Sequence, residues 1–150
     1  MKKVEALRDE LVKNFSFLDG KIGIPRPRRV FVEVGQDKFE EVFVWAKDKQ
    51  DFSHLCTITG LDENDRLILI YHLAHDSGVL LNIRTSVPKS DPRIKSIIKY
   101  FPGAEIYERE LEDLFGAKVE GLPEGNRYPL TDEWPKDEHP LLKDWKPKSA

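Results

Sequence analysis

The amino-acid sequence predicts an α+β protein: a single domain whose mainly antiparallel sheet is packed by helices, followed by an extended, proline-rich C-terminal tail. Short stretches in which β-branched residues alternate with other residues predict strands, and apolar residues three and four positions apart predict helices. The composition changes beyond residue 120, where prolines become frequent. The 150 residues are the length of one ordinary domain. We therefore expect an α+β domain over residues 1–120 and a tail over residues 121–150.

Two helices and one strand are expected in the N-terminal third of the chain. Residues 1–15 predict an amphipathic helix, because apolar residues recur there at helical spacing: Val4, Leu7, Leu11 and Phe15. Residues 21–29 are basic and interrupted by prolines, so we expect a connector. The alternating segment 29–34 predicts a strand. A second helix is expected from Asp37, which can cap it, to Lys49.

Three strands and two further helices are expected in the middle of the chain. The strands cover residues 53–60, 66–75 and 79–86. The turn Asp76-Ser77-Gly78 joins the last two strands in a hairpin. Residues 92–100 predict a helix with isoleucines on its inner face. The chain breaks at Pro102-Gly103, and a last helix leads to Gly116, which suits a left-handed C-cap.

The tail combines prolines with large aromatic residues. Five of the ten prolines and two of the three tryptophans, Trp134 and Trp145, lie beyond residue 120. Prolines at this density exclude a long helix or a central strand. A disordered tail would normally lack such aromatic residues. We expect the tail both to wrap its own domain and to lie along a partner.

Composition and charge exclude several classes of protein. Charged residues make up 34% of the chain, as is common in thermophile proteins, but the net charge of −3 gives no basic field for nucleic acid. For the basic segment 21–29, a solvated connector or an interface patch is favoured over a nucleic-acid or lipid site. The single cysteine, Cys56, excludes an internal disulfide and favours a reducing, cytosolic compartment. The longest apolar run, from Leu67 to Tyr71, is far below the roughly 18 residues of a spanning helix, so other chains are expected to provide membrane contact.

The segment from Glu105 to Glu124 is unusually acidic. It holds seven carboxylates against two cations, Arg109 and Lys118. Its apolar residues form one helical stripe: Tyr107, Leu111, Leu114 and Phe115. From the residues alone, an ordinary amphipathic helix is favoured over a functional site. Because the crowded carboxylates repel one another, we expect cations to reach them from the basic connector or from another subunit.

Metal binding and acid–base catalysis are weaker interpretations. The candidate metal ligands are His54, Cys56, His72, His75 and His139. Strand alternation leaves two of them convergent, whereas zinc takes three or four protein ligands. The carboxylates Glu108, Glu110 and Asp113 would suit a small self-contained enzyme, but no recognisable pocket motif accompanies them. That enzyme, and a free nucleic-acid adaptor, are the alternatives from other classes of protein.

The run from Tyr107 to Gly116 resembles the hallmark of a known family. The hallmark is tyrosine or tryptophan, then E-R-E, two variable residues, D, L or M, F or Y, and G, and every fixed position is met here. The family is the 30 kDa subunit of respiratory complex I, the NADH–quinone oxidoreductase, with homologues in group 4 membrane-bound hydrogenases. The ending His139 to Trp145 is similar to the family's H-P-L-R-K-D motif and its following aromatic residue. Gly121 to Arg127 departs from the respiratory branch and looks more like the hydrogenase side or its archaeal relatives.

The resemblance implies a non-catalytic assembly subunit in the peripheral, cytoplasmic arm of a membrane-bound oxidoreductase that couples electron transfer to ion translocation. It would have no cofactor of its own and would pack against a hydrogenase-large-subunit-like chain near the cluster-bearing small subunit. Those partners would carry iron–sulfur clusters and, in a hydrogenase, a nickel–iron centre. The alternative within the family is a quinone- or sulfur-compound-reductase complex. The residues expected at the interface are Glu108, Arg109, Glu110, Asp113, Leu114, Phe115, Trp134, His139, Pro140, Leu141, Lys143, Asp144 and Trp145.

Overall fold

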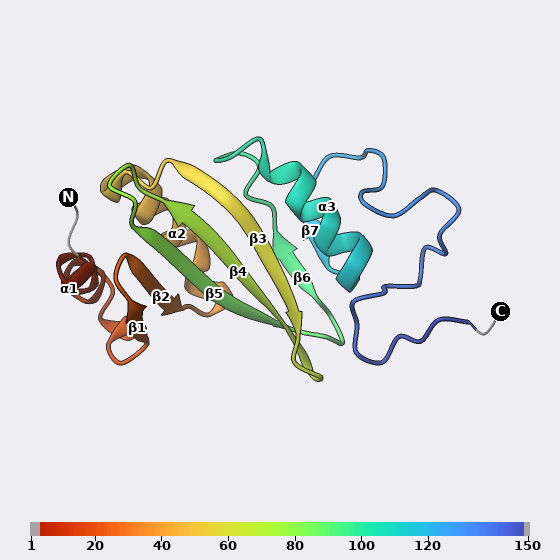
Figure 1. Cartoon of the computed structure of the whole chain (residues 1–150), viewed down its shortest axis with the longest axis horizontal. Helices are drawn as coiled ribbons and strands as arrows, with labels where there is room; N and C mark the ends of the chain where they lie inside the picture. Colours follow the sequence, from red (N-terminus) through yellow and green to blue (C-terminus); the bar gives the residue numbers. More distant parts are fainter. Residues whose placement is uncertain (1–3, 149–150) are drawn as a thin grey trace. The chain divides into compact units, whose positions relative to one another are not determined.

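The computed structural model describes residues 4–148 (Figure 1). The architecture is α+β, with a mixed, mostly antiparallel five-stranded sheet packed by helices, as the sequence predicts. The chain forms two compact units, each made of two stretches of sequence. The first unit comprises residues 1–59 and 70–85, and the second comprises residues 60–69 and 86–150.

The main sheet has the strand order β1-β2-β5-β4-β3 (Figure 1). Its strands are β1 (Ile22–Arg26), β2 (Arg29–Glu33), β3 (His54–Asp62), β4 (Arg66–Ala74) and β5 (Leu80–Pro88). β1 pairs with β2 in antiparallel orientation, whereas β2 pairs with β5 in parallel, with Val30 opposite Leu81. Short turns connect β3 to β4 and β4 to β5, so these hydrogen-bonded neighbours are antiparallel. The predicted strands at residues 29–34 and over residues 53–86 are confirmed.

Two α-helices pack within the first unit: α1 (Val4–Asn14) and α2 (Gln36–Gln50). A single 3-10 turn, η1 (Ser16–Leu18), follows α1. Leu7 and Leu11 of the predicted stripe form the buried side of α1. The buried side of α2 consists of Phe39, Val42, Phe43 and Ala46. On α2, the rings of Phe39 and Phe43 lie 4.6 and 5.9 Å from the ring of Tyr71 on β4. Helix α2 therefore covers the sheet face that carries Tyr71.

The second unit is built around α3 (Ala104–Phe115), the helix formed by the acidic segment. Two three-residue strands, β6 (Arg93–Lys95) and β7 (Lys118–Glu120), pair in parallel on either side of it in sequence. A Cβ on Gly60 of β3 would lie 2.6 Å from the Phe115 ring and 3.0 Å from Leu111 Cδ2. Glycine at this position therefore allows α3 to approach β3 closely. The segment from residue 121 to residue 148 forms neither helix nor strand (Figure 1).

Three local predictions are wrong. Residues 92–100 do not form a helix: β6 pairs with β7, and the Ser96 N–H then bonds the Glu120 carbonyl at 2.8 Å. Residues 21–29 are not a connector but the hairpin of β1 and β2, whose tip places Arg28 at φ 62°. Helix α2 begins at Gln36 after Gly35, with no side-chain capping bond from Asp37. In each case tertiary pairing or backbone geometry overrides a local sequence signal.

Candidate functional site

The buried carboxylate of Glu108 joins α3 to the chain that precedes it. Glu108 has no exposed surface. Its oxygens accept hydrogen bonds from the Ile97 backbone N–H at 2.7 Å and from the Ser96 hydroxyl at 2.6 Å. Burial raises the pKa of Glu108 even though both donors favour the ionised form. This hallmark residue therefore fixes the loop after β6 to the helix.

Asp113, also buried, ties the C-terminal segment to α3. Its Oδ1 accepts a bond from Arg127 Nε at 3.1 Å, and its Oδ2 accepts one from the Leu130 backbone N–H at 3.1 Å. The Arg127 guanidinium also donates to the Trp134 carbonyl. The cation that meets this carboxylate comes from the tail itself. The expectation that the basic connector or another subunit supplies it is therefore wrong for Asp113.

The C-terminal end of α3 is capped by the same segment. Gly116 ends the helix in the left-handed conformation at φ 70°, as the sequence predicts. A helix leaves its last carbonyls without intrahelical partners. Here His139 Nδ1 donates to the Asp113 carbonyl at 2.9 Å, and the Leu141 N–H donates to the Leu114 carbonyl at 3.0 Å. The tail therefore completes the hydrogen bonding of the helix end.

Arg109 holds the start of the tail. Its guanidinium Nη2 lies 2.9 Å from Glu105 Oε1, one turn earlier in α3, and donates to the Pro123 carbonyl at 2.7 Å. The side chain is 11% exposed. A Cβ on Gly125 would lie 2.5 Å from Arg109 Nη2. The arginine thus lies directly under the chain at residues 123–125.

Asp62, at the end of β3, anchors the last part of the tail. It accepts bonds at 2.8 Å from Lys89 Nζ and from the backbone N–H groups of Lys143 and Asn64. Burial alone would raise the pKa of Asp62, but the Lys89 ammonium and the two N–H donors outweigh it, so the pKa lies below its ordinary value. Lys89 also lies 3.2 Å from Asp144 of the tail. Asp62 and Lys89 together therefore make four charged or polar contacts: the one between them, two from backbone N–H groups to Asp62, and one from Lys89 to Asp144.

Two tryptophans of the tail share one glutamate. The rings of Trp134 and Trp145 are 5.8 Å apart. Trp134 Nε1 donates to the Glu138 carbonyl at 2.8 Å, and Trp145 Nε1 donates to its carboxylate at 3.2 Å. The Lys148 ammonium beside this carboxylate, together with Trp145, holds the pKa of Glu138 below its ordinary value. The two tryptophans of the tail are therefore partnered within the tail.

The thirteen predicted interface residues differ in exposure. Three are buried: Glu108, Asp113 and Phe115. Seven are half-buried: Arg109, Glu110, Leu114, Trp134, His139, Pro140 and Trp145. Three are exposed: Leu141, Lys143 and Asp144. The buried ones can influence a partner only through the surface that they hold in place.

One flank of α3 stays open and mostly apolar. Ile106 is 52% exposed, and Tyr107, Glu110 and Leu114 follow it at helical spacing, each half-buried. Leu141, which is 51% exposed, is joined to Leu114 by its backbone bond. We call these five residues the docking surface. Its single carboxylate lies among four apolar or aromatic side chains.

Sequence reasoning missed five residues that organise this region: Asp62, Lys89, Ser96, Arg127 and Glu138. Arg127 carried a usable signal, because it is the only cation between Lys118 and Lys136 in an acidic stretch. No pattern in the sequence indicated the contacts of Asp62, because its partners lie up to 81 residues away in sequence.

Two of the predicted metal-ligand candidates, His72 and His75, are occupied by hydrogen bonds to neighbouring side chains. His72 lies between Thr59 Oγ1 at 2.9 Å and Asn82 Oδ1 at 2.6 Å, and His75 Nδ1 lies 2.9 Å from Ser77 Oγ. Within residues 4–148, no three His, Cys, Asp or Glu side chains are grouped so that they could hold a metal ion. No helix in that range has the length and apolar character needed to cross a membrane.

Fold and site define an α+β domain whose C-terminal segment is fastened along its third helix by the buried hallmark carboxylate of Asp113, by Arg109 and by the helix end. Residues 32–150 match the family described as "Respiratory-chain NADH dehydrogenase, 30 Kd subunit". The chain belongs to this family, and it is thus a subunit of a complex I-like oxidoreductase.

Two relatives align over most of their length. One, from Methanosarcina mazei, is a subunit of an F(420)H(2) dehydrogenase; it is 33% identical over 140 residues, which cover 91% of this chain and 88% of the relative. The other, from Moorella thermoacetica, is a subunit of an NADH-quinone oxidoreductase; it is 29% identical over 140 residues, which cover 91% of each chain. The fold is similar to that of a chain in the membrane-bound sulfane sulfur reductase, an archaeal respiratory membrane complex. That match has a TM-score of 0.84 and 24% identity and covers 97% of this chain and 86% of the other.

Proposed function

We propose that the protein is a non-catalytic assembly subunit in the peripheral, cytoplasmic arm of a membrane-bound, complex I-like oxidoreductase of the group 4 hydrogenase type or a close relative. Residues 1–120 would form its body, and residues 121–150 would dock on a partner. The partner would be the hydrogenase-large-subunit-like chain, close to the cluster-bearing small subunit. Iron–sulfur clusters, and a nickel–iron centre in a hydrogenase, would belong to those chains.

The observation that carries this proposal is the fastening of the tail by Asp113. Both carboxylate oxygens of Asp113, and both of Glu108, are engaged by donors of the same chain. Carboxylates engaged in this way are poor candidates for acid–base catalysis, which speaks against a self-contained enzyme. The bonds of Asp113 hold the tail to α3, and the Leu141 N–H bonds the Leu114 carbonyl, so that Leu141 becomes part of the docking surface. An apolar surface of this kind suits a stable protein partner.

The reaction of the whole complex has a second candidate. The relative from Methanosarcina mazei is a subunit of an F(420)H(2) dehydrogenase, and its 33% identity over nearly the full chain favours a complex that takes electrons from a reduced cofactor. The large subunit distinguishes the two: nickel-binding cysteines would indicate a hydrogenase, and their absence would indicate a dehydrogenase or reductase.

Purification of the tagged chain from its own membranes tests the proposal. After mild detergent extraction at low salt we expect the large and small subunits to co-purify, identified by mass spectrometry. The variant Ile106→Glu should reduce their recovery roughly tenfold, because it places a charge on an apolar interface. The matched control is Leu61→Glu, since Leu61 is 44% exposed and neighbours Gly60 on a strand, so it faces away from α3. Recovery of the chain alone would overturn the proposal.

A further inference from the structure

Glu110 is the one charged residue of the docking surface. It is half-buried on α3, with Ile106 and Tyr107 about one turn before it and Leu114 one turn after it. Within residues 4–148, no hydrogen-bond donor and no cation contacts the Glu110 carboxylate. The carboxylate therefore lies among apolar and aromatic side chains without a partner from the described part of its own chain.

The other carboxylates of α3 all have partners in the chain. Glu105 lies 2.9 Å from an arginine of the same helix. Both oxygens of Glu108 and both of Asp113 accept hydrogen bonds. Glu112 accepts a hydrogen bond from a backbone N–H of β7. Glu110 thus differs from every neighbouring carboxylate of the acidic helix.

The two arginines that contact α3 carboxylates are engaged elsewhere. The Arg109 guanidinium is bonded to Glu105 and to a carbonyl at the start of the tail. The Arg127 guanidinium is bonded to Asp113 and to a second tail carbonyl. Turning either arginine toward Glu110 would break the contacts that fasten the tail. A counter-ion for Glu110 must therefore come from outside these contacts.

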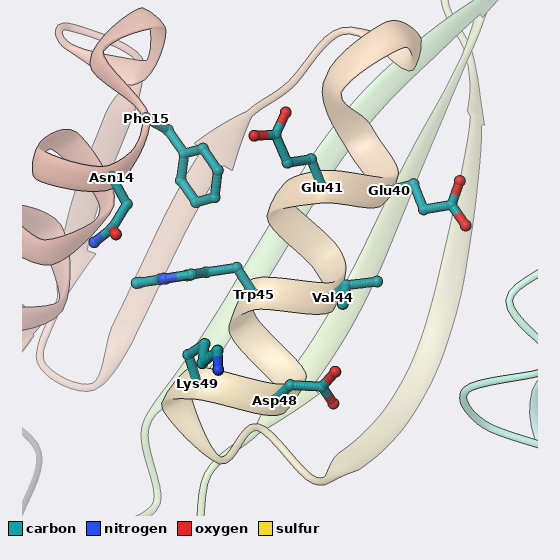
Figure 2. A pocket seen from close by; sticks show the side chains of 8 residues that line it. All are labelled: Asn14, Phe15, Glu40, Glu41, Val44, Trp45, Asp48 and Lys49. Carbon is teal, nitrogen blue, oxygen red and sulfur yellow. The ribbon is translucent and has the colours of Figure 1, made fainter.

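Other carboxylates of the chain are either partnered or well exposed. Beside the groove between α1 and α2 (Figure 2), Glu41 meets Lys38 at 3.3 Å and Asp48 meets Lys47 at 2.9 Å. Both of these carboxylates are also exposed, so they keep their water. Across the part of the chain that the structure describes, every buried or half-buried carboxylate other than Glu110 has a partner.

The geometry points to Glu110 as the residue that receives a positively charged side chain of the partner subunit. This inference rests on the proposed function, because it needs a partner that covers the docking surface. An apolar partner surface removes water from the carboxylate, and an ionised carboxylate with neither water nor a counter-ion is strongly disfavoured. A cation within the apolar contact compensates that loss and fixes how the two chains align. The matching surface of the partner is therefore apolar, with one cation opposite Glu110.

Recovery of the partner subunits with Glu110 variants tests this inference. Glu110→Leu enlarges the apolar surface, so a purely apolar contact would keep or raise the recovery. A cation opposite Glu110 is instead left without its partner, and we expect the recovery to fall roughly tenfold. Glu110→Gln should also lower it, whereas Glu110→Asp, which keeps the charge, should retain more. The matched control is Glu5→Leu, which replaces an exposed carboxylate on α1 and should leave the recovery unchanged.

The outcomes separate this inference from the proposed function. The isolated Glu110 variants should unfold at the same urea concentration as the wild-type chain, because no partner within residues 4–148 is lost. Recovery with Glu110→Leu at or above the wild-type level would overturn the inference, and so would wild-type recovery with Glu110→Gln. The proposed function would still stand if Ile106→Glu loses the partners. If the wild-type chain recovers none, both fail.

Carboxyl labelling of the wild-type protein gives a second readout that needs no variant. Carbodiimide with glycine ethyl ester should modify Glu110 in the isolated chain, and the modification should fall roughly fivefold in the assembled complex, where the partner covers it. The exposed Glu5 should be labelled alike in both states. Equal labelling of Glu110 in the two states would show that its carboxylate is not covered, and the inference would fail.

Discussion

The Arg127 guanidinium lies 3.1 Å from the Asp113 carboxylate, joining two residues 14 positions apart in sequence. Asp113 is one of the residues that the family resemblance implies at the interface with a partner. In the structure its charge is neutralised by the chain's own tail, and its backbone carbonyl receives the His139 ring. A hallmark carboxylate can therefore shape the surface of its own domain without being exposed on it.

Replacing Asp113 by alanine should release the tail without unfolding the domain. The change removes the carboxylate that accepts hydrogen bonds from both the Arg127 guanidinium and the Leu130 N–H, so both donors lose this partner. The Arg127 and Asp113 side chains are only 18% and 10% exposed, so the loss should be about 3 kcal/mol of unfolding free energy. Urea unfolding measures the loss, and limited proteolysis should cut the tail within residues 121–138.

The matched control for this change is Asp132→Ala, which removes an exposed carboxylate from the same tail. It should change the unfolding free energy by less than about 0.5 kcal/mol. Equal proteolysis of Asp113→Ala and the wild-type protein would show that Asp113 does not hold the tail.

Asp62→Asn should destabilise the protein in a pH-dependent way. The pKa of Asp62 in the folded state lies below its ordinary value of 3.8, so its stabilising contribution is complete above that value and is lost as the pH falls through the folded-state pKa. Near pH 7 the variant should lose about 2 kcal/mol, because Asn cannot pair with the Lys89 ammonium. Urea unfolding at a series of pH values should show the two proteins converging in acid. A constant difference down to about pH 3 would contradict the role of the charge.

Much of the fold follows from local patterns in the sequence. The buried stripes of α1 and α2 repeat at helical spacing, and β4 and β5 alternate around a short turn, so neighbouring residues alone specify these elements. β6 could not be predicted in this way, because its three residues become a strand only by pairing with β7, 25 residues later. The isoleucines around it imitate a helical stripe.

The candidate site was predictable in kind but not in its contacts. The acidic helix, its glycine cap and the need to bury the tail aromatics follow from residue types. Two of its hydrogen bonds depend on long-range geometry, which no spacing in the sequence encodes. They run from the Lys143 N–H to Asp62 and from the Ile97 N–H, in the loop after β6, to Glu108. The burial of Glu108 could not be predicted from the sequence either, because a glutamate within a charged run is usually solvated.

Glu108→Gln should change the pH dependence of stability in the opposite direction to Asp62→Asn. Burial raises the pKa of Glu108 above its ordinary value of 4.5, so the ionised side chain costs stability near pH 7 and this cost disappears as the pH falls through the raised pKa. The glutamine of the variant has no charge to lose. The wild-type protein should therefore gain stability relative to the variant as the pH falls from neutral toward the ordinary value.

The measurement is again urea unfolding at a series of pH values, with Glu120→Gln, an exposed residue, as the control. Parallel curves for Glu108→Gln and the wild-type protein would mean that Glu108 titrates alike in the folded and unfolded states. That result would remove the electrostatic argument for its burial and leave only its hydrogen bonds.

Gly116→Ala and Gly121→Ala together measure how firmly the tail caps α3. Both glycines have positive φ, 70° and 89°, so alanine strains the backbone by about 1 kcal/mol at either position. At Gly121 the new Cβ meets nothing closer than Ser96 Cβ at 3.8 Å, whereas at Gly116 it would lie 2.7 Å from the His139 ring. Gly116→Ala should therefore cost about 1–2 kcal/mol more than Gly121→Ala, because the ring must move and its bond to the Asp113 carbonyl weakens. Thermal or urea unfolding gives the two costs, and the His139 ring resonances report the displacement directly. Equal costs with unmoved His139 resonances would show that the ring does not hold the helix end, and the tail would then be fastened by Arg109, Asp113, Asp62 and the Leu141 N–H.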